Sequence, residues 1–124
     1  MYSILDIDLD MVKVLRDSQR LAIKKIQEIV EQAVDISANT VTIEFAEEGG
    51  LEVLFGVGHR RVGGILVDRT LEAAVMRLIH QRAGLEKRLC GMMHWESQGQ
   101  DLKIRVEEYD SFGETAYKLK FPKR

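Results

Sequence analysis

The chain has 124 residues, which is enough for one hydrophobic core but too short for two. Hydrophobic residues make up 45% and charged residues 31%, the composition of a folded domain and not of a disordered tail. The net charge of −2 gives no electrostatic reason to expect nucleic acid as a partner. A single domain that does not bind nucleic acid is therefore the starting expectation.

The sequence also carries expectations about the compartment. The first ten residues contain acids in place of the basic stretch and apolar run of a secretory signal. No apolar run approaches the roughly 20 residues that span a bilayer. The only cysteine, Cys90, excludes an internal disulfide. We expect a cytoplasmic, soluble protein without a membrane span.

The first predicted elements are an N-terminal arm and a helix. Residues 1–17 mix apolar and acidic side chains, and we expect a strand or arm that runs into a short helical stretch. A helix is predicted from Ser18 to Ile36, where apolar residues recur at helical spacing. Ser18 is the expected N-cap, since its hydroxyl can accept a hydrogen bond from a free first-turn amide. The apolar residues form one stripe: Ala22, Ile23, Ile26, Ile29, Val30, Ala33 and Val34.

Alternating apolar residues predict six strands beyond this helix. The strands come in two groups of three, separated by a second helical pattern. The first group covers residues 41–45, 51–57 and 60–67, and the second covers 89–96, 102–109 and 115–121.

The second helix is predicted from about Asp68 or Thr70 to Ala83, with Gly84 as its C-terminal cap. The pair Gly63-Gly64 is expected at a bulge or a close backbone approach. The element order, α-β-β-β-α-β-β-β after an N-terminal arm, predicts an α+β fold. In this fold antiparallel hairpins form a sheet, and the two helices pack on one side of it.

Several segments resemble one known family. The first helix is followed by Ala38-Asn39-Thr40-Val41-Thr42-Ile43-Glu44. This segment is similar to the A-S-D-I-H-I-E motif in the N-terminal, PAS-like partner domain of the type II secretion and type IV pilus assembly ATPases. Ala83-Gly84-Leu85 and the run from Gly113-Glu114 to Leu119-Lys120 follow in the family's order. The resemblance covers about Ile23 to Phe121.

The resemblance implies one domain over residues 1–124, with an arm at 1–17 and a module like the secretion-ATPase N-terminal domain at 18–121. Leu54 and Gly56 replace two arginines that approach nucleotide in the family, and Cys90-Gly91-Met92-Met93 replaces its P-Q-D-G signature. The G-x-x-x-x-G-K-[ST] loop of the motor domain is absent from the sequence. The resemblance therefore implies a non-catalytic protein-interaction or regulatory module, uncoupled from ATP and without a cofactor.

Four residues are candidates for partner contact: Arg60, Arg61, Trp95 and Tyr109. Arginine and large aromatic side chains dominate binding hot spots, which is why these were singled out. The expected partner is a protein, such as a component of secretion or pilus assembly. Self-association into a homo-oligomer is another form that this binding could take.

Metal binding and catalysis have weaker signals. Cys90 and His94 form one loose pair, with His80 and His59 elsewhere, whereas a structural zinc site needs two close pairs. We therefore expect no metal site and no catalytic residue, and we expect Cys90 to be a buried, inert strand residue.

Two other functions remain open at this point. The first alternative is a sensory, PAS-like domain that holds a small ligand between sheet and helix. A pocket lined by Phe55, Leu78 and Trp95 would favour that function. The second is a small enzyme, for which the sequence offers no nucleophile or acid/base pair.

Overall fold

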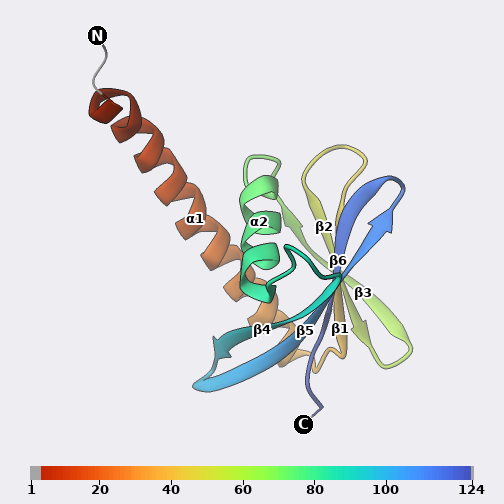
Figure 1. The fold of residues 1–124 in the computed structure, drawn as a ribbon. Helices are drawn as coiled ribbons and strands as arrows, with labels where there is room; N and C mark the ends of the chain where they lie inside the picture. The colour runs from red at the N-terminus through yellow and green to blue at the C-terminus, as the bar shows by residue number, and fades with distance from the viewer. Residues whose placement is uncertain (1–3, 124) are drawn as a thin grey trace.

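The computed structural model describes the backbone of residues 4–123 and the side chains from residue 10 to residue 123. Two helices and six strands make up the fold (Figure 1). The order along the chain matches the predicted α-β-β-β-α-β-β-β pattern and confirms the α+β class. The elements are α1 (Ile4–Asp35), β1 (Thr40–Phe45), β2 (Leu51–Val57), β3 (Arg60–Val67), α2 (Glu72–Ala83), β4 (Cys90–Ser97), β5 (Gln100–Ser111) and β6 (Glu114–Lys120).

The strands form one antiparallel sheet in the order β3-β2-β1-β6-β5-β4. Each group of three is a meander, and the meanders join where β1 pairs with β6, with Val41 opposite Leu119. Helix α2 connects the two outermost strands, β3 and β4. The sheet centre is therefore built from strands at opposite ends of the sequence.

Both helices lie on the same face of the sheet (Figure 1). Alternation along the strands points one set of side chains toward the helices, as Val41, Ile43 and Phe55 show by their complete or nearly complete burial. The buried residues of both helices join this set in one continuous core. The other face of the sheet is free of helices, and we call it the open face.

Two local predictions are confirmed. Gly84 caps α2 in the left-handed conformation, with φ 67° and ψ 44°, which glycine adopts without strain. The register between β2 and β3 shifts between Glu52 and Leu54, so a bulge lies where Gly64 was expected to mark one. A Cβ at Gly64 would overlap the ring of Phe55, which explains the glycine.

The start of the first helix was predicted wrongly. The arm expected ahead of residue 18 is present as a helical extension, because α1 runs without interruption from Ile4 to Asp35. Ser18 lies inside this helix and is not its N-cap. No glycine or proline occurs between residues 4 and 35, so nothing in the sequence breaks the helix.

Candidate functional site

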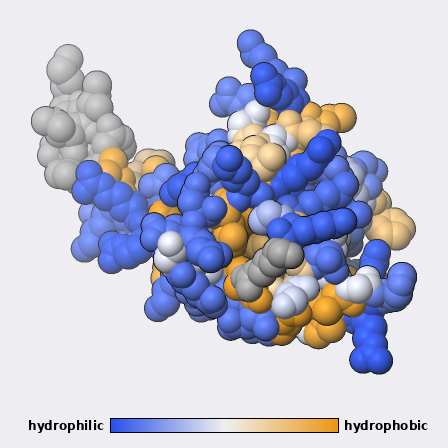
Figure 2. Space-filling view, turned by 90° about the horizontal axis from the view of Figure 1, so that it is seen from below, coloured by the Kyte–Doolittle hydropathy of each residue, from blue (hydrophilic) through white to orange (hydrophobic). Residues whose placement is uncertain are grey.

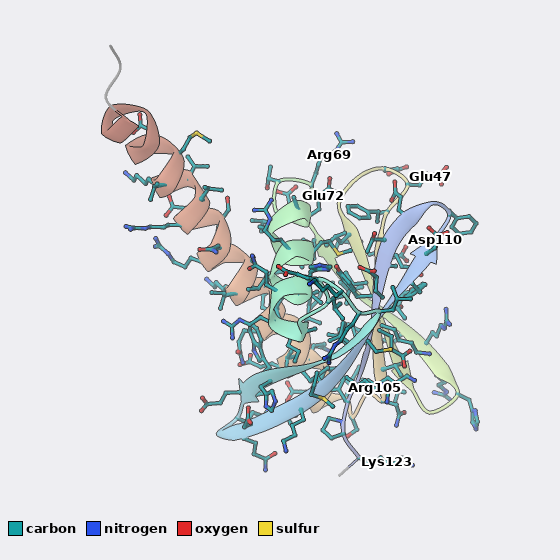
Figure 3. All side chains as sticks on the ribbon, viewed as in Figure 1. Glu47, Arg69, Glu72, Arg105, Asp110 and Lys123 are labelled. Carbon is teal, nitrogen blue, oxygen red and sulfur yellow. The ribbon has the colours of Figure 1, made fainter. Side chains whose placement is uncertain are left out.

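The first half of α1 projects beyond the rest of the fold (Figure 1). The helix has 32 residues, which is ~48 Å at about 1.5 Å per residue. Its second half packs against α2 and β4. Figure 3 draws side chains on this half from residue 10 onward, and they stand clear of the sheet.

A seven-residue repeat runs along the face that α1 buries, with spacings that alternate between three and four. From Ala22 to Ala33 the members of this repeat are buried in the core. Toward the N-terminus the same spacing continues through Val12 and Leu15, but there the side chains are exposed. We call this set the inner stripe: Val12, Leu15, Gln19, Ala22, Ile26, Ile29 and Ala33.

A second apolar repeat lies beside the first on the projecting half. Met11, Val14, Ser18 and Leu21 again follow spacings of three and four, and we call them the outer stripe. The exposed fractions are 60% for Met11, 64% for Val14 and 49% for Leu21. Figure 2 shows hydrophobic atoms at the surface of this projecting part, among hydrophilic ones. Large apolar side chains exposed together in this way mark an interaction surface.

A hollow of about 360 Å³ separates the projecting half from α2. On the α1 side it is lined by inner-stripe residues, including Val12 and Leu15, and by Ser18 of the neighbouring face. On the α2 side Leu78 contributes apolar surface and Arg77 a charge. Met11, Val14 and Leu21 do not line this hollow, so most of the outer stripe faces away from α2.

Charged residues flank the two stripes. Arg20 donates to Asp17 at 2.9 Å within the helix, and both side chains are mostly exposed. Asp10, Lys13 and Arg16 are exposed as well. The projecting half is therefore an amphipathic helix without a covering element among residues 4–123.

The structure brings together two of the four predicted contact residues, Arg61 and Tyr109, on the open face. They line one hollow there with Glu44 and Lys118. The Tyr109 hydroxyl donates to Glu44, and burial together with that carboxylate raises the pKa of Tyr109. Arg61 lies across from Gly56, one of the two positions where the resembling family has arginine.

The other two predicted contact residues lie elsewhere. Arg60 is exposed at the start of β3, beside the β2–β3 turn. Trp95 is almost fully buried, and its indole N–H donates to the Gln27 side-chain oxygen at 2.7 Å. The Arg82 guanidinium lies 5.2 Å from the centre of the Trp95 ring. Both the polar and the aromatic contacts of Trp95 are thus made inside the domain.

A polar cluster between α2 and the sheet was not found from the sequence. His80 Nδ1 lies 3.0 Å from the Tyr117 hydroxyl and 3.6 Å from a Glu108 carboxylate oxygen. Burial, and then the charge of Glu108, raises the pKa of Tyr117 to about 12. The cluster lines an open hollow of about 610 Å³ with Arg77 and Met76. Its members come from α2, β5 and β6, so no sequence spacing could have revealed it.

The residues weighed from the sequence as metal ligands, Cys90, His94, His80 and His59, form no common cluster. Within the described residues, no group of three His, Cys, Asp or Glu side chains could hold a metal ion. His94 lies 3.3 Å from Asp101, while His80 belongs to the tyrosine cluster. Cys90 is exposed at the start of β4, so the expectation of a buried cysteine is wrong. It begins an outermost strand, where alternation leaves it uncovered.

Comparisons with known proteins add no family. No protein-family model matches the chain, and no curated protein matches it. Separately, none of the helices in the described part of the chain is both long enough and apolar enough to cross a membrane. The arrangement of side chains therefore carries the functional argument.

Proposed function

We propose that this chain is a non-catalytic protein-interaction module whose contact surface is the projecting half of α1. One observation carries the proposal. Beside the repeat that builds the core in the second half of α1, a second apolar repeat, the outer stripe, lies exposed along the first half. A helix face of this kind is stable in water only at a cost, because each Å² of apolar surface left exposed forgoes about 25 cal/mol of burial free energy.

A bound partner would recover that free energy. Short helices without tertiary contacts are marginal in water, and most of their stability in proteins comes from packing of an apolar face. Met11, Val14 and Leu21 provide such a face. An amphipathic helix whose apolar residues recur at three and four is a common element of protein recognition.

The family relationship is a narrower part of the proposal. The matches to secretion and pilus ATPase N-terminal domains fall on Val41 and Ile43 in the core, on the Gly84 cap, and on Gly113 in a turn. Each of these residues is also required by the fold itself. The support for a family relationship therefore lies in the order of these residues along the chain. The relationship suggests secretion or pilus assembly components, and a cytoplasmic setting, as the first to test.

Site-specific photo-cross-linking tests the interaction surface. Benzoylphenylalanine replaces Val14 in the full chain, which is then irradiated in the native cell extract. We expect a discrete cross-linked band. The matched control places the same group at Glu31, an exposed residue on the packed half of α1. Equal cross-linking at both positions, or none at position 14, would contradict the proposal.

The hollow beside His80 favours a second candidate function, the binding of a small ligand between sheet and helix. A pocket lined by Phe55, Leu78 and Trp95 would have favoured this function, but all three are buried residues of the core. The His80 hollow instead offers Arg77, Tyr117 and Met76. Native mass spectrometry of the chain purified from its own cells would show a bound mass if a ligand occupies it. We would expect His80→Leu to abolish that mass.

A further inference from the structure

The geometry points to a second copy of this chain as the occupant of the outer stripe: two α1 helices pair antiparallel through their projecting halves. This inference rests on the proposed interaction function and names its partner. Two independent features of the helix carry it. One is the symmetry of the outer stripe, and the other is the distribution of charge along the helix.

The spacing of the outer stripe is the same whether it is followed from the N-terminus or from the C-terminus. Met11, Val14, Ser18 and Leu21 continue at the same spacing in the sequence to positions 4 and 7, both isoleucine. In an antiparallel pair centred between residues 12 and 13, Met11 lies opposite Val14 of the other copy. Position 4 lies opposite Leu21, and position 7 opposite Ser18. Each layer of the seam then matches a first repeat position with a fourth one. Two of the three kinds of layer pair apolar residues with each other, and the third sets position 7 opposite the small side chain of Ser18.

Charge along the helix favours the same direction. Residues 4–10 contain three acids and no base, whereas residues 15–21, which they face in the antiparallel pair, contain two bases, Arg16 and Arg20, and one acid, Asp17. Arg20 already pairs with Asp17. An antiparallel pair lays the acidic end of each helix along the basic segment of the other. A parallel pair would place acid beside acid and base beside base, which is unfavourable.

The rest of the described fold does not obstruct this pairing. Most of the outer stripe faces away from the hollow between α1 and α2, so α2 does not obstruct a second helix. The seam is short, about 27 Å for residues 4–21 at about 1.5 Å per residue. We therefore expect a dimer that dissociates on dilution.

Sedimentation of the purified full chain over a wide concentration range tests the pairing. We expect a reversible monomer–dimer equilibrium. Val14→Glu places a charge in the seam and should raise the dimer dissociation constant at least about tenfold. The control, Ile23→Glu, makes the same kind of change at an exposed residue of α1 outside the outer stripe and should leave it nearly unchanged. Circular dichroism on both variants verifies that the fold is retained.

Cysteine cross-linking tests the direction, in a chain whose own thiol is removed by Cys90→Ser. A disulfide requires Cα atoms within about 7 Å. Leu21→Cys alone should therefore give no cross-linked dimer, whereas a mixture of Leu21→Cys and Ile4→Cys chains should. A dimer cross-linked by Leu21→Cys alone would overturn the antiparallel arrangement.

The outcomes separate this inference from the proposed function. A chain that stays monomeric at every concentration, yet cross-links from position 14 to a different protein, overturns self-pairing and leaves the interaction module standing. A monomer without any cross-link overturns both. A dimer that Val14→Glu does not weaken overturns the seam.

Discussion

The two halves of α1 share one apolar repeat but have different surroundings. From Ala22 onward the inner stripe is buried against α2 and the sheet, whereas from Val12 to Gln19 it is exposed. The difference teaches that a helical repeat shows which face needs to be covered without showing what covers it. In the second half the chain's own core covers the inner stripe. In the first half the neighbouring outer stripe is exposed as well, and we assign a second copy as the cover of that stripe.

The lengths of the elements explain the division. Helix α1 extends for ~48 Å, while β4, the strand against which it packs, has 8 residues and is about 26 Å long. One helix is therefore longer than the surface on which it can pack. The excess forms the projecting half.

The largest expected contrast between the halves is in stability. Ile29→Ala removes a fully buried side chain from the packed half and should lower the free energy of unfolding by about 2–5 kcal/mol. Val14→Ala in the projecting half should change it by less than about 0.5 kcal/mol in dilute monomer. Urea unfolding at low protein concentration measures both. Equal losses would show that the two halves are packed alike.

A smaller effect is expected where the packed half is anchored to β4. Gln27→Leu would leave the buried Trp95 indole N–H without its acceptor, which should cost about 1–3 kcal/mol. The same substitution in a Trp95→Phe background tests the cause, because no donor is then left unpaired. If the two backgrounds respond alike, the hydrogen bond does not anchor the helix.

Alkaline pH should lower the free energy of unfolding of the packed region and leave the projecting half unaffected. The pKa of Tyr117 is raised to about 12 and that of Tyr109 is also raised, so both stay protonated in the folded state above the normal pKa of 10. The unfolded chain then binds fewer protons, and stability falls as pH rises from about 10 to about 12. Denaturant unfolding across that range should show the fall. In Tyr117→Phe it should be smaller but still present, because Tyr109 remains.

The smallest effect is expected at the surface of the projecting half. Asp17→Asn removes the exposed ion pair with Arg20 and should change the free energy of unfolding of the monomer by less than about 0.5 kcal/mol. Thermal unfolding in low and high salt measures it. A large loss would mean that the projecting half is packed in the monomer after all.

Periodicity made most of the fold predictable. Val41, Ile43 and Phe55 alternate in strands whose bounds were close to those observed, and Gly84 ended α2 as expected. Ser18 misled the prediction because a serine between apolar turns resembles a cap, yet a serine is also tolerated within a helix. The apolar pattern cannot distinguish a serine that caps a helix from one inside a longer helix when the preceding residues are amphipathic too.

The candidate site was less predictable, for a physical reason. Arg61 and Tyr109 were chosen because their side chains are typical of contacts, and the sheet register places them in one hollow. Their role in partner contact stays a prediction. Trp95 was chosen by the same rule, but its ring is packed between α1, α2 and β4. The cluster of His80, Glu108 and Tyr117 depends on tertiary contacts alone. The outer stripe was visible in the sequence only once residues 4–17 were known to be helical.

Hydrogen exchange along α1 at several protein concentrations tests the central claim most directly. If the projecting half is a self-pairing surface, amides of residues 10–21 exchange rapidly in dilute solution and become protected as concentration rises. Amides of residues 22–35 stay protected throughout, and Val14→Glu removes the concentration dependence. Protection of residues 10–21 that is the same at every concentration and unaffected by Val14→Glu would contradict the claim.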